Sequence, residues 1–290
     1  MITNRAYSLL GGDFPRVRAF LDENCGQFGE KSRGAEYWEY AHSHPAFVYA
    51  SNWRNRLWEE DGRLVAVAWY EMELGKAYLT CDDAHEGLLD EMLDYAEAWL
   101  SRDGKLQVEV TSCQPERAKW LESRGYRLDW AEDENQYDLV GVEVPAPQLP
   151  EGFAMRRVSE IPPSEWQKLV TAIHHGFDHE GEGDVDTCGL ILAAPDVRPE
   201  LARVVVAPNG DYAAYAGMWF NEKNRYAYLE PLCTQPGYRK LGLAKALLYA
   251  ILAQVQAMGA RYMTGGDNPF YRAIGYRTRY RHLTYEKVLK

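Results

Sequence analysis

One short segment of the chain could bind a phosphate group. Its kernel is Arg239-x-x-Gly242-x-Ala244, at the start of a long helical pattern of apolar residues. The first N–H groups of a helix have no acceptors within it, and the helix dipole adds partial positive charge there. Small residues let a phosphate approach this backbone closely, and Arg239 and Lys240 add full charges. The segment is therefore a candidate cradle for a pyrophosphate, although such a glycine often marks only a turn.

A second segment lies beyond the long helix and reads as a strand, a glycine break, a short helix and a strand. Its central part is Asn268-Pro269-Phe270-Tyr271-Arg272-Ala273-Ile274-Gly275-Tyr276. Together the two segments resemble the coenzyme A-binding core of the GNAT superfamily of N-acetyltransferases. The first resembles the pyrophosphate loop of that family, and the second resembles the segment that carries its tyrosine general acid. The motifs cover about residues 226–277, and the order of elements extends the resemblance over 152–290.

The resemblance implies acetyl-CoA as cosubstrate, and it implies roles for particular residues. The strand before the loop would be splayed, and its free backbone groups would pair with the pantetheine arm. Pro231 suits such an interruption, because it removes a ladder donor. N–H groups near Leu232 could polarise the thioester carbonyl. The cofactor-binding residues implied are Leu232, Cys233, Thr234, Arg239, Lys240, Leu241, Gly242, Leu243, Ala244 and Asn268.

Two side chains would move protons in the reaction that the resemblance implies. Tyr271 would be the general acid that protonates the departing thiolate, and the alternative is a tyrosine packed in the core. Glu230 is the first candidate for the base that takes a proton from the attacking ammonium, and the alternative is a structural ion pair with an arginine. Asn268 would hydrogen-bond the coenzyme or cap the short helix, and these two roles are compatible.

The elements that must position these residues fall into two halves. Residues 142–151 contain three prolines. Because proline fixes φ and cannot donate to a strand ladder, this stretch is predicted to be an extended linker. We therefore predict two domains, at 1–141 and 152–290.

Both halves show the same order of predicted elements. Helix, paired strands, a long helix with apolar residues three and four apart, a strand, a short helix and a final strand follow one another in each. Tyr78-Leu79 recurs as Tyr228-Leu229, and Gly125-Tyr126-Arg127 recurs as Gly275-Tyr276-Arg277, both at an offset of 150 residues. These repeats indicate duplication. The predicted fold class is α/β, with two tandem GNAT-like units, each a mixed β-sheet flanked by helices.

The first half lacks both chemical segments. Acidic residues stand where the cradle should be, namely Asp82, Asp83 and Glu86. They suit a helix N-terminus but would repel a pyrophosphate. At the offset of 150, Leu121 stands opposite Tyr271, and Thr80 stands opposite Glu230. We expect a degenerate unit that shapes the acceptor site or holds the active unit rigid.

A histidine-rich stretch at the end of the predicted helix 166–177 is a weaker candidate site. It contains His174, His175, Asp178, His179 and Glu180. Two of the histidines are four residues apart, a spacing that can bind a metal from one helical face, but a glycine interrupts the helix. We expect no metal site here, and instead a loop that faces the acceptor or a solvated acidic loop.

Charge is shared unevenly between the halves. Of the net charge of −11, residues 1–141 hold 15 Lys+Arg against 27 Asp+Glu, and residues 142–290 hold 17 against 16. An acidic half argues against nucleic acid as a partner and could attract a cation, although a solubilising surface is equally consistent.

Other features predict a cytoplasmic protein that binds no membrane. No apolar run approaches the roughly 20 residues of a membrane span, and the first residues lack the apolar core of a signal peptide. The five cysteines are dispersed, which argues against a disulfide framework or a thiolate zinc site. We expect a monomer or a homodimer.

The function predicted is transfer of an acyl group, most simply acetyl, from acyl-CoA to a primary amine. A small cationic acceptor such as a polyamine or an aminoglycoside-like molecule fits the acidic balance. One rival is acylation of a protein lysine or N-terminus. Another is a non-catalytic module that senses acyl-CoA.

Overall fold

The structure is a computed structural model that describes residues 1–289, apart from the side chain of residue 188. Contacts divide it into two compact units. Unit 1 comprises residues 1–134 and the final segment from 278 onward, and unit 2 comprises residues 135–277. Lys290, which ends the predicted second domain, lies outside the described residues.

Unit 1 is built on a mixed sheet with helices packed against it. Its strands are β1 (Ile2–Ala6), β2 (Arg56–Glu60), β3 (Arg63–Trp69), β4 (Lys76–Cys81), β5 (Lys105–Thr111) and β12 (Arg277–Val288). Its helices are α1 (Asp13–Asn24), α2 (Ala35–Ser43), α3 (Leu89–Trp99) and α4 (Pro115–Ser123), with 3₁₀ turns η1 (Tyr49–Arg54) and η2 (Asp83–Leu88). The strand order is β1-β2-β3-β4-β5-β12, and β4 and β5 form a parallel pair among antiparallel ones.

Unit 2 repeats this plan. Its strands are β7 (Ala154–Arg157), β8 (Arg203–Val206), β9 (Tyr212–Asn221), β10 (Tyr226–Thr234) and β11 (Tyr262–Gly265). Its helices are α5 (Trp166–Gly176), α6 (Val185–Leu192), α7 (Leu243–Ala257) and α8 (Pro269–Ala273), with 3₁₀ turns η3 (Val158–Glu160), η4 (Pro163–Glu165) and η5 (Pro236–Tyr238). The order is β11-β10-β9-β8-β7, and β10 and β11 are the parallel pair. The predicted fold class is confirmed.

Strand register supports the duplication that the sequence indicated. In unit 1, Trp69 of β3 pairs with Tyr78 of β4. In unit 2, Trp219 of β9 pairs with Tyr228 of β10, so both members of the pair recur at the offset of 150 residues.

The long helix α7 fixes the part of unit 2 that matters for chemistry. Its apolar residues at helical spacing are fully buried, namely Leu247, Leu248, Ile251 and Val255. They form one core with residues of β9, β10 and β11. Each such side chain contributes about 1.5–3 kcal/mol on burial, so the start of α7 is held firmly against the sheet.

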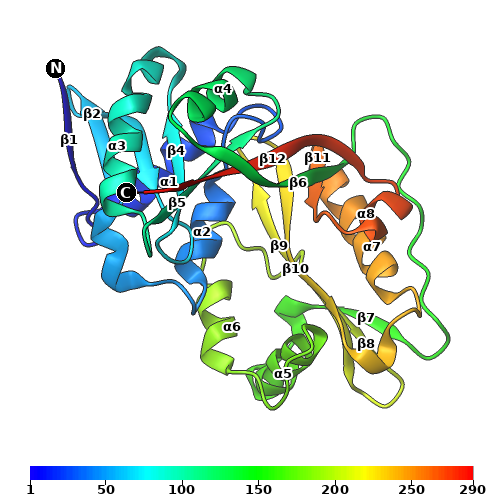
Figure 1. Cartoon of the computed structure of the whole chain (residues 1–290). Helices are drawn as coiled ribbons and strands as arrows, with labels where there is room; N and C mark the ends of the chain where they lie inside the picture. Colours follow the sequence, from blue (N-terminus) through cyan, green and yellow to red (C-terminus); the bar gives the residue numbers. More distant parts are fainter. Residues whose placement is uncertain (290) are drawn as a thin grey trace. The chain divides into compact units, whose positions relative to one another are not determined.

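The final strand of each repeat departs from the plan expected of a simple tandem. β12 is the last strand of the second half, yet it pairs with β5 of unit 1 (Figure 1). The strand β6 (Arg127–Asp138) belongs to the first half, yet its last residues pair with β11 in unit 2. The units therefore divide at residues 134/135 and 277/278. The predicted domains 1–141 and 152–290 are continuous stretches of the chain, so their bounds differ from those of the two units. The predicted linker 142–151 contains no helix or strand.

No helix in the described chain combines the length and the apolar character that a bilayer crossing requires. Among the cysteines whose side chains are described, Cys25, Cys81 and Cys233 are buried and Cys113 is exposed, all as free thiols.

Candidate functional site

The strands β10 and β11 separate soon after they begin. They pair only at Tyr226 with Tyr262 and at Ala227 with Met263. One step further, the Leu229 N–H donates to the Thr264 hydroxyl at 3.2 Å in place of a strand carbonyl. On its other edge β10 stays paired with β9 up to Thr234. The structure thus shows the splayed strand that the sequence predicted, with the edge of its second half turned away from β9 and unpaired with β11.

A bulge interrupts β10 at the point of separation. The register with β9 shifts between Leu229 and Leu232, so Glu230 and Pro231 lie outside regular pairing. Gly217 of β9 faces the bulge, and a Cβ on it would lie 2.3 Å from the Glu230 carbonyl oxygen. Only glycine fits there, because any side chain would collide with backbone. Sequence reasoning missed Gly217, although a glycine inside a strand pattern is a recognised signal for a bulge.

The predicted phosphate cradle lies between η5 and α7. Lys240 and Gly242 both adopt left-handed backbone conformations, with φ of 64° and 78°. Among the described residues, no acceptor bonds the N–H groups of Lys240, Leu241 or Gly242. Alternation of backbone handedness can turn successive N–H groups toward one concavity, which is suited to an anion. The first turn of α7 follows directly and adds its own N–H groups.

The side chains of the predicted cofactor residues take different directions. Leu243 and Cys233 are buried, and burial raises the pKa of the Cys233 thiol to about 12. These two residues can therefore offer only backbone groups. Leu241 is 45% exposed, and Leu232, Thr234 and Ala244 are half-buried.

Arg239 is engaged by protein groups in this structure. Its guanidinium donates to the carbonyl oxygens of Thr234 at 3.0 Å and Gly176 at 3.1 Å, and to Asp178 at 2.9 Å. The sequence analysis predicted that the Arg239 guanidinium lies beside the phosphate. In the structure it instead links Gly176 at the end of α5, and Asp178 after it, to Thr234 at the end of β10. Lys240, which is exposed, is the charge left beside the cradle.

Tyr271 lies on the short helix α8, which Asn268 caps by accepting the Phe270 N–H at 2.9 Å. Its ring packs against backbone at two successive glycines. A Cβ on Gly265 would lie 2.7 Å from the ring, and one on Gly266 would lie 3.0 Å from it. The two glycines of the predicted glycine break therefore leave the space into which the Tyr271 ring packs.

Tyr271 and Glu230 are electrostatically coupled. Burial, and to a smaller extent the negative charge of Glu230, raise the pKa of Tyr271 to about 12 against the opposing effect of the Gly266 backbone N–H. The phenol therefore stays protonated at neutral pH and can serve as an acid. The carboxylate beside it is half-buried.

The histidine-rich loop folds back on itself. His174 Nε2 lies 3.0 Å from the Glu180 carbonyl oxygen, and His175 Nε2 lies 2.8 Å from that of Gly181. Within the described residues, no group of three or more potential ligands is placed to hold a metal ion. A cavity of about 430 Å³ lies beside this loop, and its lining includes Gln235 and Pro236, which lead into the phosphate cradle.

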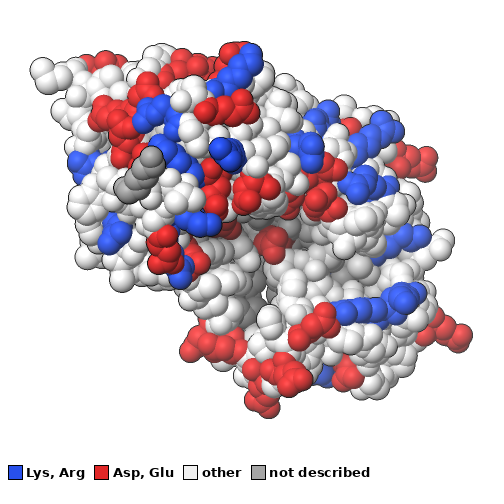
Figure 2. Space-filling view, viewed as in Figure 1, with Lys and Arg blue, Asp and Glu red and all other residues white. Residues whose placement is uncertain are grey.

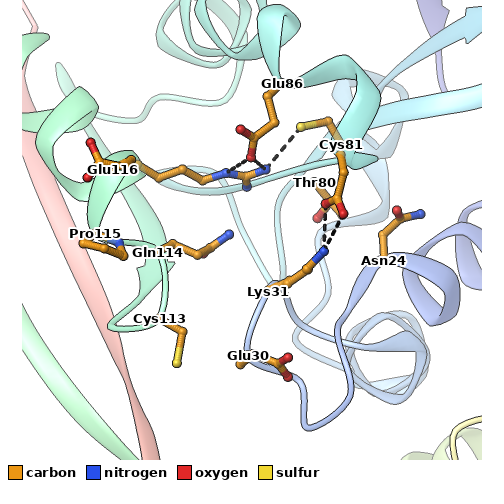
Figure 3. Close-up of a pocket in the computed structure, with 12 residues that line it drawn as sticks. Asn24, Glu30, Lys31, Thr80, Cys81, Glu86, Cys113, Gln114, Pro115 and Glu116 are labelled. Atoms are coloured by element: carbon orange, nitrogen blue, oxygen red, sulfur yellow. Dashed lines mark hydrogen bonds and ion pairs between the residues drawn. The ribbon is translucent and has the colours of Figure 1, made fainter.

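Unit 1 has a cavity of about 420 Å³ at the corresponding place, between the end of β4 and the start of α4 (Figure 3). Ion pairs fill the position of the cradle. Lys31 bonds Asp83 at 2.7 Å, and Arg117 bonds Glu86 at 3.1 Å and Cys81 Sγ at 3.3 Å (Figure 3). These contacts occupy five of the side chains that line the cavity, and the carboxylates of Asp83 and Glu86 oppose an anionic ligand.

Comparison with known proteins agrees with this geometry. Residues 165–276 match the family model described as the acetyltransferase (GNAT) family. No curated protein has a significant sequence match to the chain.

Solved structures with the same fold span both units. A GCN5-related N-acetyltransferase from Sphaerobacter thermophilus is 17% identical, with 99% of this chain and 95% of that chain covered and a TM-score of 0.64. A tandem GNAT protein from the clavulanic acid biosynthesis pathway is 13% identical, with coverage of 99% and 98% and a TM-score of 0.70. N-myristoyltransferase from Saccharomyces cerevisiae, solved with bound myristoyl-CoA, is 11% identical, with coverage of 99% and 79% and a TM-score of 0.57.

These likenesses establish a tandem GNAT fold over the whole chain, as the sequence predicted. The roles of individual residues stay predictions. With its family match at residues 165–276, unit 2 carries an N-acetyltransferase domain of the GNAT family.

Proposed function

We propose that unit 2 transfers an acetyl group from acetyl-CoA to a primary amine of a small cationic molecule, such as a polyamine or an aminoglycoside-like compound. Membership of the GNAT family gives acyl-CoA-dependent N-acyl transfer in general. The acetyl group, the acceptor and the assignment of residues are the parts that we add.

The proposed reaction proceeds by direct attack. The coenzyme pyrophosphate lies against the N–H groups of Lys240 to Ala244, and the pantetheine arm pairs with the open edge of β10. Glu230 takes a proton from the ammonium, directly or through water. The amine nitrogen then attacks the thioester carbonyl carbon, and the C–S bond breaks. Tyr271 donates its proton to the thiolate, and the acylated nitrogen, which still carries one extra proton, returns a proton to the Tyr271 phenolate through water. The products are the neutral amide and coenzyme A, and the proton taken from the ammonium is left on Glu230.

One observation supports this proposal most strongly. The open strand edge, the N–H groups without acceptors and the coupled pair Glu230 and Tyr271 occur together in unit 2. Unit 1 has the same backbone plan, but ion pairs stand at the cradle position and a fully buried Leu121 stands opposite Tyr271. A sensor that only binds acyl-CoA has no use for a proton donor, so the pair favours an enzyme.

The choice of a cationic acceptor rests on charge. Figure 2 shows Asp and Glu side chains in scattered patches on the visible face of unit 1, with Lys and Arg among them. Several of these acids form ion pairs, as Asp90 and Asp94 do with Arg124, and such pairs reduce the field that a cation would feel. Unit 1, which comprises residues 1–134 and 278–290, holds 27 Asp+Glu against 19 Lys+Arg and therefore keeps a net negative charge. The cytoplasmic location and the monomeric or homodimeric state remain predictions.

The first test is calorimetric titration of acetyl-CoA into the wild type and Leu241→Glu. Leu241 is exposed and has no left-handed φ, so the substitution adds a carboxylate to the cradle without backbone strain. We expect one site in the wild type and a loss of affinity of at least about tenfold, because one unit of like charge near a phosphate costs more than 1 kcal/mol when partly desolvated.

Two controls isolate the charge and the place. Leu241→Gln has nearly the same shape without the charge and should bind within about twofold of the wild type. Gly87→Glu adds the same charge to η2 of unit 1, where a Cβ meets nothing within 4 Å, and should not change binding. Absence of acetyl-CoA binding in the wild type would overturn the proposal.

The acceptor and the acyl chain are tested by transfer assays. Acetyl-CoA and myristoyl-CoA are each paired with spermidine, kanamycin and a lysine-containing peptide. We expect acetyl transfer to one of the small amines. Transfer only to the peptide would replace the small acceptor with a protein, and preference for myristoyl-CoA would replace the acetyl group.

A further inference from the structure

The end of strand β6 forms part of unit 2, although the sequence assigns it to the first half. Asn135, Gln136, Tyr137 and Asp138 pair in register with Gly265, Thr264, Met263 and Tyr262 of β11. β11 leads directly into the glycine turn and α8. Whatever fixes this end of β11 therefore also fixes the start of the segment that carries Tyr271.

Asn135 holds the turn by its side chain as well as by its backbone. It is fully buried, and its Nδ2 donates to the carbonyl oxygen of Gly266 at 3.0 Å. Gly266 is the first residue after β11, and it is exposed. A buried amide that loses such a partner leaves an unsatisfied group, which makes this bond costly to break.

Gly266 in turn contacts Tyr271 in two ways. Its Cα lies beneath the ring, because a Cβ there would be 3.0 Å from Cε2. Its backbone N–H acts on the phenol and lowers the pKa of Tyr271 against the opposing effects of burial and Glu230. A shift of Gly266 would therefore move both the position and the acidity of the Tyr271 hydroxyl.

Tyr137 supplies a second contact from the same strand. Residues two apart on a strand share a face, so Tyr137 stands on the same side of β6 as Asn135. Its ring packs edge-on against Tyr276 with centroids 5.4 Å apart, and Tyr276 packs edge-on against Tyr271 at 5.2 Å. Two residues of β6 therefore support Tyr271 indirectly. Asn135 acts through Gly266, and Tyr137 acts through the ring of Tyr276.

We propose that Asn135 is a positioning residue for Tyr271, and that the first repeat thereby contributes, through β6, to proton transfer in unit 2. This inference rests on the proposed role of Tyr271 as general acid. In this proposal the last strand of the degenerate half, β6, fixes the turn at Gly266 against which Tyr271 packs.

The main experiment is a double-mutant cycle between Asn135→Ala and Tyr271→Phe, with the amine that the transfer panel identifies. At saturating acetyl-CoA, Asn135→Ala should lower kcat by about 10–100-fold, the scale expected for a misplaced catalytic group, and should change the acetyl-CoA Kd by less than about twofold. In the Tyr271→Phe background the same change should lower kcat by less than about twofold, because the group that it positions is absent. Equal losses in both backgrounds, or an unchanged kcat in the single variant, would overturn the inference.

Gln256→Ala is the matched control for stability. Gln256 also donates its side-chain amide to backbone carbonyls in unit 2, those of Leu139 at 2.6 Å and Val142 at 2.7 Å. It makes no described contact with the turn. Its loss should lower the urea midpoint as Asn135→Ala does, without an effect on kcat. If Asn135→Ala does not fold, the milder Asn135→Ser takes its place in the cycle.

A second measurement does not depend on any amine. With 3-fluorotyrosine at position 271, the ¹⁹F signal reports the environment and titration of that one phenol. Asn135→Ala should shift the signal and raise its titration midpoint, because the Gly266 N–H no longer favours the phenolate. Gln256→Ala should leave both unchanged. If Tyr271→Phe keeps full kcat, the proposed general acid fails, and an unchanged ¹⁹F signal in Asn135→Ala separately overturns the positioning role.

Discussion

The parallel pairs β4–β5 and β10–β11 have the same backbone plan and different chemistry. Each makes only two paired steps before it opens. In unit 2 the bulge at Glu230 and Pro231 interrupts β10, and acceptor-free N–H groups follow. In unit 1 β4 stays in continuous register with β3 up to Cys81, and acidic side chains tied to Lys31 and Arg117 follow. Both units therefore share strand separation, and they differ in the bulge, the loop and the acid that we propose for the coenzyme site of unit 2.

Unit 1 has a buried charge cluster near its own strand opening. Glu109 of β5 is almost fully buried and pairs with Arg33 at 2.7 Å, Lys76 at 2.8 Å and His282 of β12 at 3.0 Å. These cations offset the cost of burial and hold the pKa of Glu109 well below its usual range. The charged side chains near this strand opening therefore pair with one another inside unit 1. This comparison favours the proposal that unit 2 binds the coenzyme and that unit 1 gives structural support.

The sharpest way to break this comparison is to remove the proposed acid. Tyr271→Phe should lower kcat by about 10²–10⁴-fold, the range typical of general acid catalysis, and should leave acetyl-CoA affinity unchanged. Steady-state kinetics and calorimetry measure the two effects. Tyr95→Phe in unit 1, which removes a hydroxyl bonded to the Arg54 carbonyl, is the control and should keep kcat. A Tyr271→Phe protein with normal turnover would leave both units without an assigned acid.

The next test concerns the support assigned to unit 1. Glu109→Ala should reduce the free energy of unfolding by about 3–5 kcal/mol, because it leaves buried cations without their partner. The control Glu116→Ala removes an exposed carboxylate paired with Lys119 and should change stability by less than about 1 kcal/mol. Urea unfolding at neutral pH measures both, and similar small losses would mean that the cluster is not structural.

The same cluster predicts how stability depends on pH. The folded pKa of Glu109 is lowered, so its contribution is present above the unfolded pKa of about 4.5 and is lost as pH falls through the folded value. The folded pKa of His282 is raised by Glu109 and Glu134 against the opposing effects of burial and Arg33. Its contribution is complete below the unfolded pKa and is lost as pH rises through the folded one. Urea midpoints of the wild type measured across acid and neutral pH should therefore depend on pH more strongly than those of Glu109→Ala.

The smallest expected change is a shift in the pKa of Tyr271. It tests whether Glu230, which stands where unit 1 has Thr80, acts on the phenol. Glu230→Gln should lower the pKa of Tyr271 below its value of about 12, because a nearby negative charge no longer favours the neutral phenol. Glu230→Gln should also lower kcat, because it removes the proposed base, so the shift is measured on the remaining activity. The alkaline limb of that kcat profile should move to lower pH, whereas Glu230→Asp should move it less. An unchanged limb in Glu230→Gln would show that the carboxylate does not act on the phenol.

The sequence predicted the parts of the site that depend on local chemistry. Gly242 and Tyr271 could be selected as candidates because a helix start and a glycine break need particular residues at fixed spacing, and their roles stay predictions. The offset of 150 residues likewise predicted two similar units, and the paired Trp and Tyr residues of β3–β4 and β9–β10 agree with it. These signals lie within single elements or their direct neighbours.

The remainder depends on contacts between distant segments. Pairing of β12 with β5, and of β6 with β11, leaves no trace in either strand's own pattern, because an alternating strand fits any suitable edge. The importance of Asn135 and Glu109 follows only from those pairings. The ion pair of Arg239 with Asp178 was missed for a similar reason, since the loop after α5 gives no sign of where it returns.

The exchange of final strands also bears on how the protein is made. On the ribosome the first half emerges long before β12, and until then β5 has no partner on the edge where Thr111, Glu109 and their neighbours pair with that strand. An uncovered strand edge invites pairing with other chains. Completion of unit 1 must wait for synthesis to reach residues 278–288, so the first half needs protection during translation that a simple tandem of independent domains would not.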